Sequence, residues 1–219
     1  MAKKQVNWAQ NVCAYMEYMG YELDQLSGCL NIIYIEGINP DFTENQDHHD
    51  RWNDLSLLIE WDSGDPKIIF SAVATTEPGN APTHSKQARL LGGVARIAFG
   101  QHRECWRLGY HNLARGKHHP ALVQCAPVKV HRDYNRDYIR TNDPIDWAKG
   151  LNQHGTWPGY NGDRVGQNSA GCLVRRLWRD HIQFIEFLKT DARVISDWNF
   201  KFSTTIIPGG KFLDWVKSK

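Results

Sequence analysis

The sequence lacks the features that cross-link a protein or carry it through a membrane. Its five cysteines are widely spaced and include no C-x-x-C pair, so a disulfide framework is not expected. No run of about 18 apolar residues occurs, so we expect no membrane insertion. The charged start of the chain is followed by no apolar core, unlike a secretory signal. We therefore expect a protein that is cytoplasmic at synthesis and reaches any target outside the cell by another route.

Charge and recognition motifs are also scarce. The formal net charge is +2, too small for strong attraction to polyanions, and there is no nucleic-acid-binding motif. We expect no nucleic-acid partner. A chain of 219 residues can bury a core as one domain, so residues 1–219 are predicted to form a single domain. Residues 1–29 are predicted to form an N-terminal helical appendage, and the sequence leaves both its docking and the oligomeric state open.

The sequence does contain short apolar runs that are separated by turns rich in Gly, Pro and Asn. These runs predict strands that are buried on both faces. Helical spacing predicts one helix over residues 6–19 and another over residues 177–189. Residues 39–54 and 76–93 are predicted loops. The fold class is therefore mainly β with flanking helices (α+β). The predicted strands are Leu30–Ile35, Leu55–Trp61, Lys67–Thr75, Arg96–Phe99, Ala121–Gln124, Val128–Arg132 and Phe200–Ile207.

One histidine and one cysteine stand in a setting that favours nucleophilic catalysis. A free thiol, with a pKa of about 8.5, is mostly protonated at neutral pH, and a neighbouring imidazole can take its proton. His154-Gly155-Thr156 precedes Ser169-Ala170-Gly171-Cys172, and small residues beside a nucleophile let a carbonyl carbon approach. The order excludes a papain-like peptidase, because His181, inside a predicted helix, is the only histidine after the cysteine.

These two segments resemble the signature of the L,D-transpeptidase (YkuD-type) catalytic domain, which reads H-G-T or H-G-S and then S-H-G-C. Thr75-Thr76-Glu77-Pro78-Gly79 is similar to the family's T-P-x-G turn. The resemblance spans residues 75–175, under half of the chain. It implies an L,D-transpeptidase-like β-sandwich or barrel core and an enzyme acting on peptidoglycan stem peptides through a thioester. It implies no cofactor and no metal.

Carried onto this chain, the resemblance makes Cys172 the nucleophile and His154 its base. The Gly155 carbonyl would orient the imidazole, and the backbone N–H groups of Gly171 and Cys172 would bind the oxyanion. Substrate contacts are expected from Ser169, Trp157, Tyr160 and Arg175. The chain departs from the family at Ala170, where the family has histidine, and at Val174, where it has Arg or Asn.

Several functions remain open from the sequence. Hydrolysis of stem peptides, as in a phage lysin or tail-associated wall hydrolase, fits the lack of an export signal. An L,D-transpeptidase that forms cross-links differs only in the group that resolves the thioester. Nine tryptophans and eight tyrosines also fit a non-catalytic cell-wall-binding or phage structural protein, because aromatic rings stack on sugars. Less favoured are zinc catalysis through Asp50, His48 and His119, and a glycosidase pair formed by Glu60 and Asp62.

Overall fold

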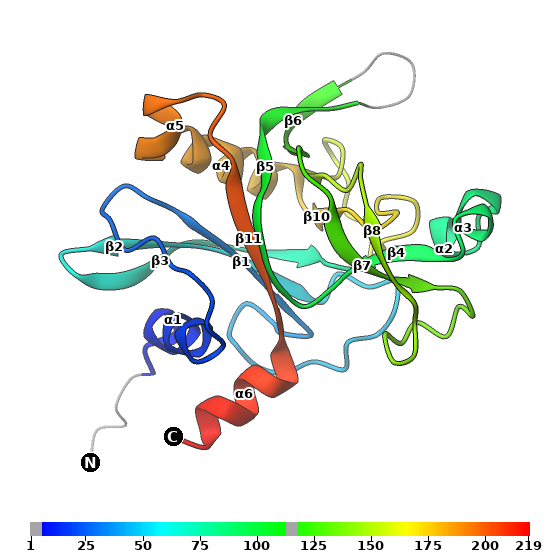
Figure 1. Ribbon diagram of the computed structural model, residues 1–219, viewed down its shortest axis with the longest axis horizontal. Helices are drawn as coiled ribbons and strands as arrows, with labels where there is room; N and C mark the ends of the chain where they lie inside the picture. The colour runs from blue at the N-terminus through cyan, green and yellow to red at the C-terminus, as the bar shows by residue number, and fades with distance from the viewer. Residues whose placement is uncertain (1–5, 113–117) are drawn as a thin grey trace.

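The computed structural model describes residues 6–112 and 118–219 as a closed eight-stranded barrel beside a three-stranded sheet (Figure 1). Around the barrel the strands run in the order β1-β11-β5-β6-β9-β10-β3-β2, and the small sheet has the order β4-β7-β8. The predicted class, mainly β with helices, is confirmed. The barrel strands are β1 Asn31–Glu36, β2 Asp54–Asp62, β3 Asp65–Thr75, β5 Gly100–Asn112, β6 His118–Gln124, β9 Gln153–Gly155, β10 Leu173–Arg175 and β11 Phe202–Pro208.

The small sheet and the helices lie around the barrel. Most strand pairs are antiparallel, but β1 pairs with β11 and β9 pairs with β10 in parallel. The small sheet consists of β4 Val94–Ile97, β7 Val128–Asp133 and β8 Ile145–Ala148. The helices are α1 Trp8–Tyr18, α2 Asn80–Thr83, α3 Lys86–Leu90, α4 Trp178–Lys189, α5 Ala192–Ser196 and α6 Gly209–Lys217. No helix among the described residues is long and apolar enough to cross a membrane.

Strand β1 shows why the apolar runs seen in the sequence need not alternate with polar residues. All six of its residues are buried, because successive side chains enter two different cores. Ile32 and Tyr34 join the cluster that fills the barrel, while Ile33 and Ile35 join a second cluster outside it. Figure 1 shows α1 and α6 on the same outer side of the barrel. A fully apolar strand therefore follows from burial on both faces, as the sequence indicated.

The predicted N-terminal helix docks on the barrel. Helix α1 begins after Asn7, whose side chain accepts a hydrogen bond from the Gln10 backbone N–H at 3.2 Å. Val12 and Met16 are buried in the outer cluster, which includes Phe212 of α6. The helix is thus an integral part of the fold. Residues 1–5 of the predicted appendage lie outside the described residues.

The predicted helix over residues 177–189 is α4, and its Phe184, Ile185 and Leu188 enter the barrel core. The predicted loop over residues 76–93 instead contains the short helices α2 and α3. Ser85 explains the second of these, because its side chain accepts the Ala88 N–H at 3.0 Å and so caps the helix. Strands β5, β8, β9 and β10 were not predicted.

Candidate active site

The parallel pair of β9 and β10 places His154 in one strand and Cys172 one residue before the other. Val174 lies opposite His154 in this pair, so both side chains project from the same face. Cys172 stands two residues before Val174 and therefore faces the same way. The opposite face of β9 points into the barrel, where the Gln153 side chain donates to Thr204 Oγ1 at 2.7 Å. His154 thus projects from the outer face of β9, and Cys172 packs with Val174 on the same side.

The imidazole of His154 is held by its own neighbour and by a second ring. Its Nδ1 lies 2.9 Å from the Gly155 carbonyl oxygen, the contact expected for an orienting carbonyl. The ring stacks on His111 of β5, with the centroids 4.1 Å apart. Burial, together with the nearby His111, lowers the pKa of His154 to about 3. The imidazole is therefore neutral across the physiological range. An Nδ1–H donated to the carbonyl leaves Nε2 as the basic nitrogen.

Gly155 is required by the packing of α4. A Cβ atom at this position would lie 2.5 Å from the Cβ of His181. His181 is itself fully buried, and its Nε2 lies 2.7 Å from the Pro120 carbonyl oxygen. The glycine after His154 thus has a structural reason as well as the proposed orienting role.

The sulfur of Cys172 is enclosed. The residue is 7% exposed and packs with Trp52, Val165 and Val174. Its thiol points to the Gly150 carbonyl oxygen at 3.9 Å. Burial raises the pKa of Cys172 to about 11.

This arrangement differs from the solvent-open, hydrogen-bonded pair that the sequence predicted. Within the described residues no hydrogen bond joins His154 to Cys172. The imidazole is stacked on His111, and the thiol is turned toward Gly150. Both residues are almost fully buried, so in this conformation the Cys172 thiol and the His154 imidazole are both neutral at physiological pH.

The turn before Cys172 is organised by Ser169. Its hydroxyl donates to the Cys172 carbonyl oxygen at 2.8 Å and accepts the Gly171 N–H at 3.1 Å. The expectation that the Gly171 amide is free to bind an oxyanion is therefore wrong in this conformation. The Cys172 amide has no hydrogen-bond partner in the described part of the chain. Ser169 acts as a turn-forming residue, being 1% exposed, and is not placed to contact a substrate.

The turn that resembles T-P-x-G lies against this segment. The Gly79 N–H donates to the Ser169 carbonyl oxygen at 2.9 Å. A Cβ on Gly79 would lie 2.1 Å from the Gly166 carbonyl oxygen, so only glycine fits there. The Asp50 carboxylate accepts two hydrogen bonds from backbone N–H groups, one from Asn80 at 3.0 Å and one from Gly166 at 2.6 Å. These hydrogen bonds therefore hold together, close to Cys172, segments that are far apart in the sequence.

A cavity of about 670 Å³ opens next to the turn. Its wall includes Ala170, which precedes Gly171, and Gly150, whose carbonyl contacts the Cys172 sulfur. The other sides are formed by α3, β4 and the end of β8, with Trp147 at 64% exposure. A peptide lying in this cavity would approach the strand pair from the side of Gly150.

The aromatic residues predicted at the entrance are in part accessible. Trp157 is 46% exposed, and its ring packs edge-on against Tyr160 at 4.8 Å. Tyr160 is half-buried and belongs to the apolar group around Cys172 and Trp52. An exposed indole beside the apolar group around Cys172 is suited to contact with a peptide or sugar.

Arg175 is not placed to bind a substrate, which corrects the expectation from the sequence. It is fully buried inside the barrel, where it donates to the Tyr34 hydroxyl at 2.7 Å and lies over the Phe184 ring at 3.1 Å. Burial lowers its pKa to about 10. Because β10 alternates its side chains, Val174 faces outward and Arg175 inward.

Comparison with family models, with curated proteins and with solved structures finds no match. The family resemblance therefore rests on the motif residues alone.

The zinc and glycosidase alternatives find no support in the described residues. His48, Asp50 and His119 do not gather as a ligand group. Asp50 is engaged by the backbone amides named above. Glu60 accepts the Gly28 N–H at 2.9 Å, and the exposed Asp62 pairs with Lys67 at 2.5 Å.

The sequence did not predict that His111, His119 and His181 lie around His154. His119 of β6 lies 5.6 Å from His154 between ring centroids, and 5.4 Å from His111. Burial lowers the pKa of His119 to about 4, and lowers that of His181 well below its ordinary value. Only the pairing of β5 with β6, where His111 lies opposite His119, reveals this group.

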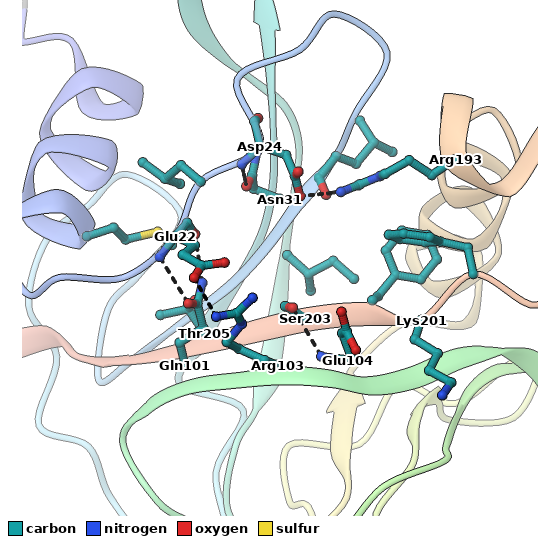
Figure 2. Close-up of a pocket in the computed structure, with 16 residues that line it drawn as sticks. Glu22, Asp24, Asn31, Gln101, Arg103, Glu104, Arg193, Lys201, Ser203 and Thr205 are labelled. Carbon is teal, nitrogen blue, oxygen red and sulfur yellow. Dashed lines mark hydrogen bonds and ion pairs between the residues drawn. The ribbon is translucent and has the colours of Figure 1, made fainter.

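A second, polar cavity of about 220 Å³ lies between the segment after α1 and strands β5 and β11. Among the charged side chains labelled in Figure 2, Glu22 pairs with Arg103 and Asp24 with Arg193. No cysteine or histidine is among the described residues that line it. The described lining of this cavity therefore offers no cysteine–histidine pair.

Proposed function

We propose that this protein is a peptidoglycan-acting cysteine enzyme of the L,D-transpeptidase type that hydrolyses stem peptides. The observation that carries the proposal is the parallel pairing of β9 with β10, which places His154 opposite Val174, two residues after Cys172. The bond between His154 Nδ1 and the Gly155 carbonyl supports it, because it directs the basic nitrogen away from the backbone. The bond from Gly79 to Ser169 supports it further by joining the two motif segments.

The chemistry begins when the Cys172 sulfur attacks the carbonyl carbon of a stem peptide and His154 Nε2 takes the thiol proton. The C–N bond then breaks, and the imidazolium gives its proton to the leaving amine. Water next adds to the thioester carbonyl as His154 takes one of its protons. The C–S bond breaks and the sulfur recovers that proton. An amine in place of water gives a cross-link by the same steps.

The resting geometry sets two requirements on this route. No hydrogen bond joins the two groups among the described residues, and the thiol lies 3.9 Å from the Gly150 carbonyl oxygen, so the thiol must rotate toward His154. Because burial keeps both groups neutral, proton transfer must accompany C–S bond formation rather than precede it. The Cys172 amide is the backbone donor proposed for the oxyanion.

A second candidate is a non-catalytic protein that binds the cell wall or forms part of a phage-type particle. The specific observation in its favour is the packing of Cys172 among Trp52, Val165 and Val174. A buried cysteine in apolar surroundings behaves as a small hydrophobe. The exposed Trp157 would then serve binding alone.

An activity assay on purified peptidoglycan distinguishes the two candidate functions. We expect the wild type to release soluble fragments, and Cys172→Ala and His154→Ala each to lower turnover at least about a hundredfold. Cys125→Ala, which removes an exposed thiol, is the matched control and should keep full activity. Mass spectrometry of the products distinguishes cleaved stems from cross-linked dimers. Normal activity of folded Cys172→Ala would overturn the proposal, and peptidoglycan binding without any turnover would establish the second candidate.

A further inference from the structure

The connection from β7 to β8 carries an oxygen-rich pattern that the proposed function does not use. It begins Asp133-Tyr134-Asn135-Arg136-Asp137, and Asp143 follows before β8. Acidic or amide residues at the first, third and fifth positions are the start of a calcium-binding loop of the EF-hand type. Such loops need a positive φ at the next residue, usually glycine, and here Tyr138 has a φ of 64°. The pattern departs from that type in having Asp143 one position before the usual final acid.

The three carboxylates converge in space. One oxygen from each of Asp133, Asp137 and Asp143 lies within 4.8 Å of the other two. Asp133 is 1% exposed and Asp143 is 7% exposed. Neither oxygen of Asp133 or of Asp143 has a hydrogen-bond partner in the described part of the chain. Two carboxylates are therefore buried without a donor and face the same point.

No arginine or lysine among the described residues pairs with these acids. The nearest guanidinium groups are those of Arg96, which pairs with Glu77, and Arg140, which pairs with Glu36. Burial and, to a smaller extent, the negative charges of Asp133 and Asp137 raise the pKa of Asp143 to about 6. An ionised carboxylate buried without a partner is costly, so the group must gain protons or a cation.

A neighbouring acidic group provides the contrast. Glu36, Asp47 and Glu77 also converge, but Arg140 and Arg96 form ion pairs with the two glutamates. Two of its three carboxylates are therefore compensated by ion pairs within the protein. Among the described residues, the acids of the loop after β7 form no ion pair, although the charges of Arg96 and Arg140 act on Asp143.

We propose that Asp133, Asp137 and Asp143 bind a divalent calcium ion. Hard carboxylate oxygens are the ligands that Ca²⁺ prefers, and its tolerance of irregular geometry suits a loop in which the final acid is displaced. The Asn135 side-chain oxygen and the Ile139 carbonyl stand at positions three and seven, where such loops supply further oxygens.

The proposed calcium ion would lie in a loop that contacts segments around the cavity of about 670 Å³. The Tyr138 hydroxyl lies 2.7 Å from His84 Nε2 and donates to Asn80 Oδ1 at 3.3 Å. Arg140, in the same loop, binds Glu36 at the end of β1. Calcium would therefore hold the loop that ties β7 and β8 to the segment containing α2. This inference does not depend on the proposed enzymatic function.

The test uses the full chain after removal of metal with a chelator. We expect CaCl₂ to raise the melting temperature and to bind saturably in calorimetry, with a Kd no weaker than about 10⁻³ M. Asp133→Asn and Asp143→Asn should each weaken binding at least about tenfold, because each removes a charged ligand. Asp146→Asn is the matched control: its carboxylate pairs with Arg132 and lies outside the group, so calcium affinity should be unchanged.

A second measurement needs no variant. Terbium bound beside Tyr134 and Tyr138 should show tyrosine-sensitised emission that CaCl₂ displaces. Failure of the wild type to bind Ca²⁺ up to about 10 mM, beyond the weakest extracellular calcium modules, would overturn the proposal. So would saturable binding of MgCl₂ alone, or calcium binding that survives both aspartate variants.

Discussion

The enclosure of Cys172 makes a quantitative prediction about its reactivity. A thiol with a pKa of about 11 is ionised in about 1 molecule in 10,000 at pH 7, against about 3% for an ordinary thiol with a pKa of about 8.5. Because only the thiolate is alkylated, ionisation alone slows Cys172 by about 300-fold. Its 7% exposure slows it further. Cys172 should thus react far more slowly than the exposed Cys125 in the same molecule.

Pulsed labelling with iodoacetamide, followed by peptide mass spectrometry, measures both rates in one sample. The rate at Cys172 should rise about tenfold for each pH unit up to the pKa of the folded state. Labelling in urea is the control, since all five cysteines should then react at similar rates. The sequence alone predicts the reverse order, with the catalytic thiol alkylated first at pH 6.

Rapid labelling of Cys172 at pH 7 would refute the structural reasoning. It would mean that the sulfur leaves its apolar surroundings in solution and that an imidazole stabilises the thiolate. The closed arrangement of Cys172 with Trp52, Val165 and Val174 would then be a minor state.

Two further predictions concern stability. Gly171 has a φ of 113°, and a Cβ there would lie 2.4 Å from the Ala95 carbonyl oxygen, so Gly171→Ala should lower the free energy of unfolding by about 2–4 kcal/mol in urea titrations. Gly159→Ala is the control, because Gly159 has a φ of 82° but open space around its Cβ; equal losses would show that the contact with Ala95 is unimportant. The pKa of His154 is depressed in the fold, so its contribution is present above about pH 6.5 and is lost as the pH falls toward about 3. The difference in unfolding free energy between wild type and His154→Gln should therefore shrink by about 1.4 kcal/mol per pH unit below about pH 6.5, and a constant difference would contradict the buried neutral imidazole.

Three of the strands that sequence reasoning missed, β5, β9 and β10, lack a clear periodic pattern. In β5, Glu104 adopts a φ of 53° and interrupts the alternation of buried and exposed residues. Strands β9 and β10 have three residues each, too few for a periodic pattern. Long apolar strands such as β1, by contrast, were predicted within a residue or two, because burial on both faces leaves a continuous apolar run.

For the site, the sequence by itself determined the candidate pair, its small-residue setting and the α+β class, since these depend on residue type and local spacing. Only the tertiary structure decided that Arg175 enters the barrel while Val174 faces out, because a three-residue strand does not reveal its inward face. The tertiary structure likewise placed His111 and His119 beside His154 and left the carboxylates of Asp133 and Asp143 without partners. Such features depend on which strands pair and on how much water they exclude, and neither quantity is local in the chain.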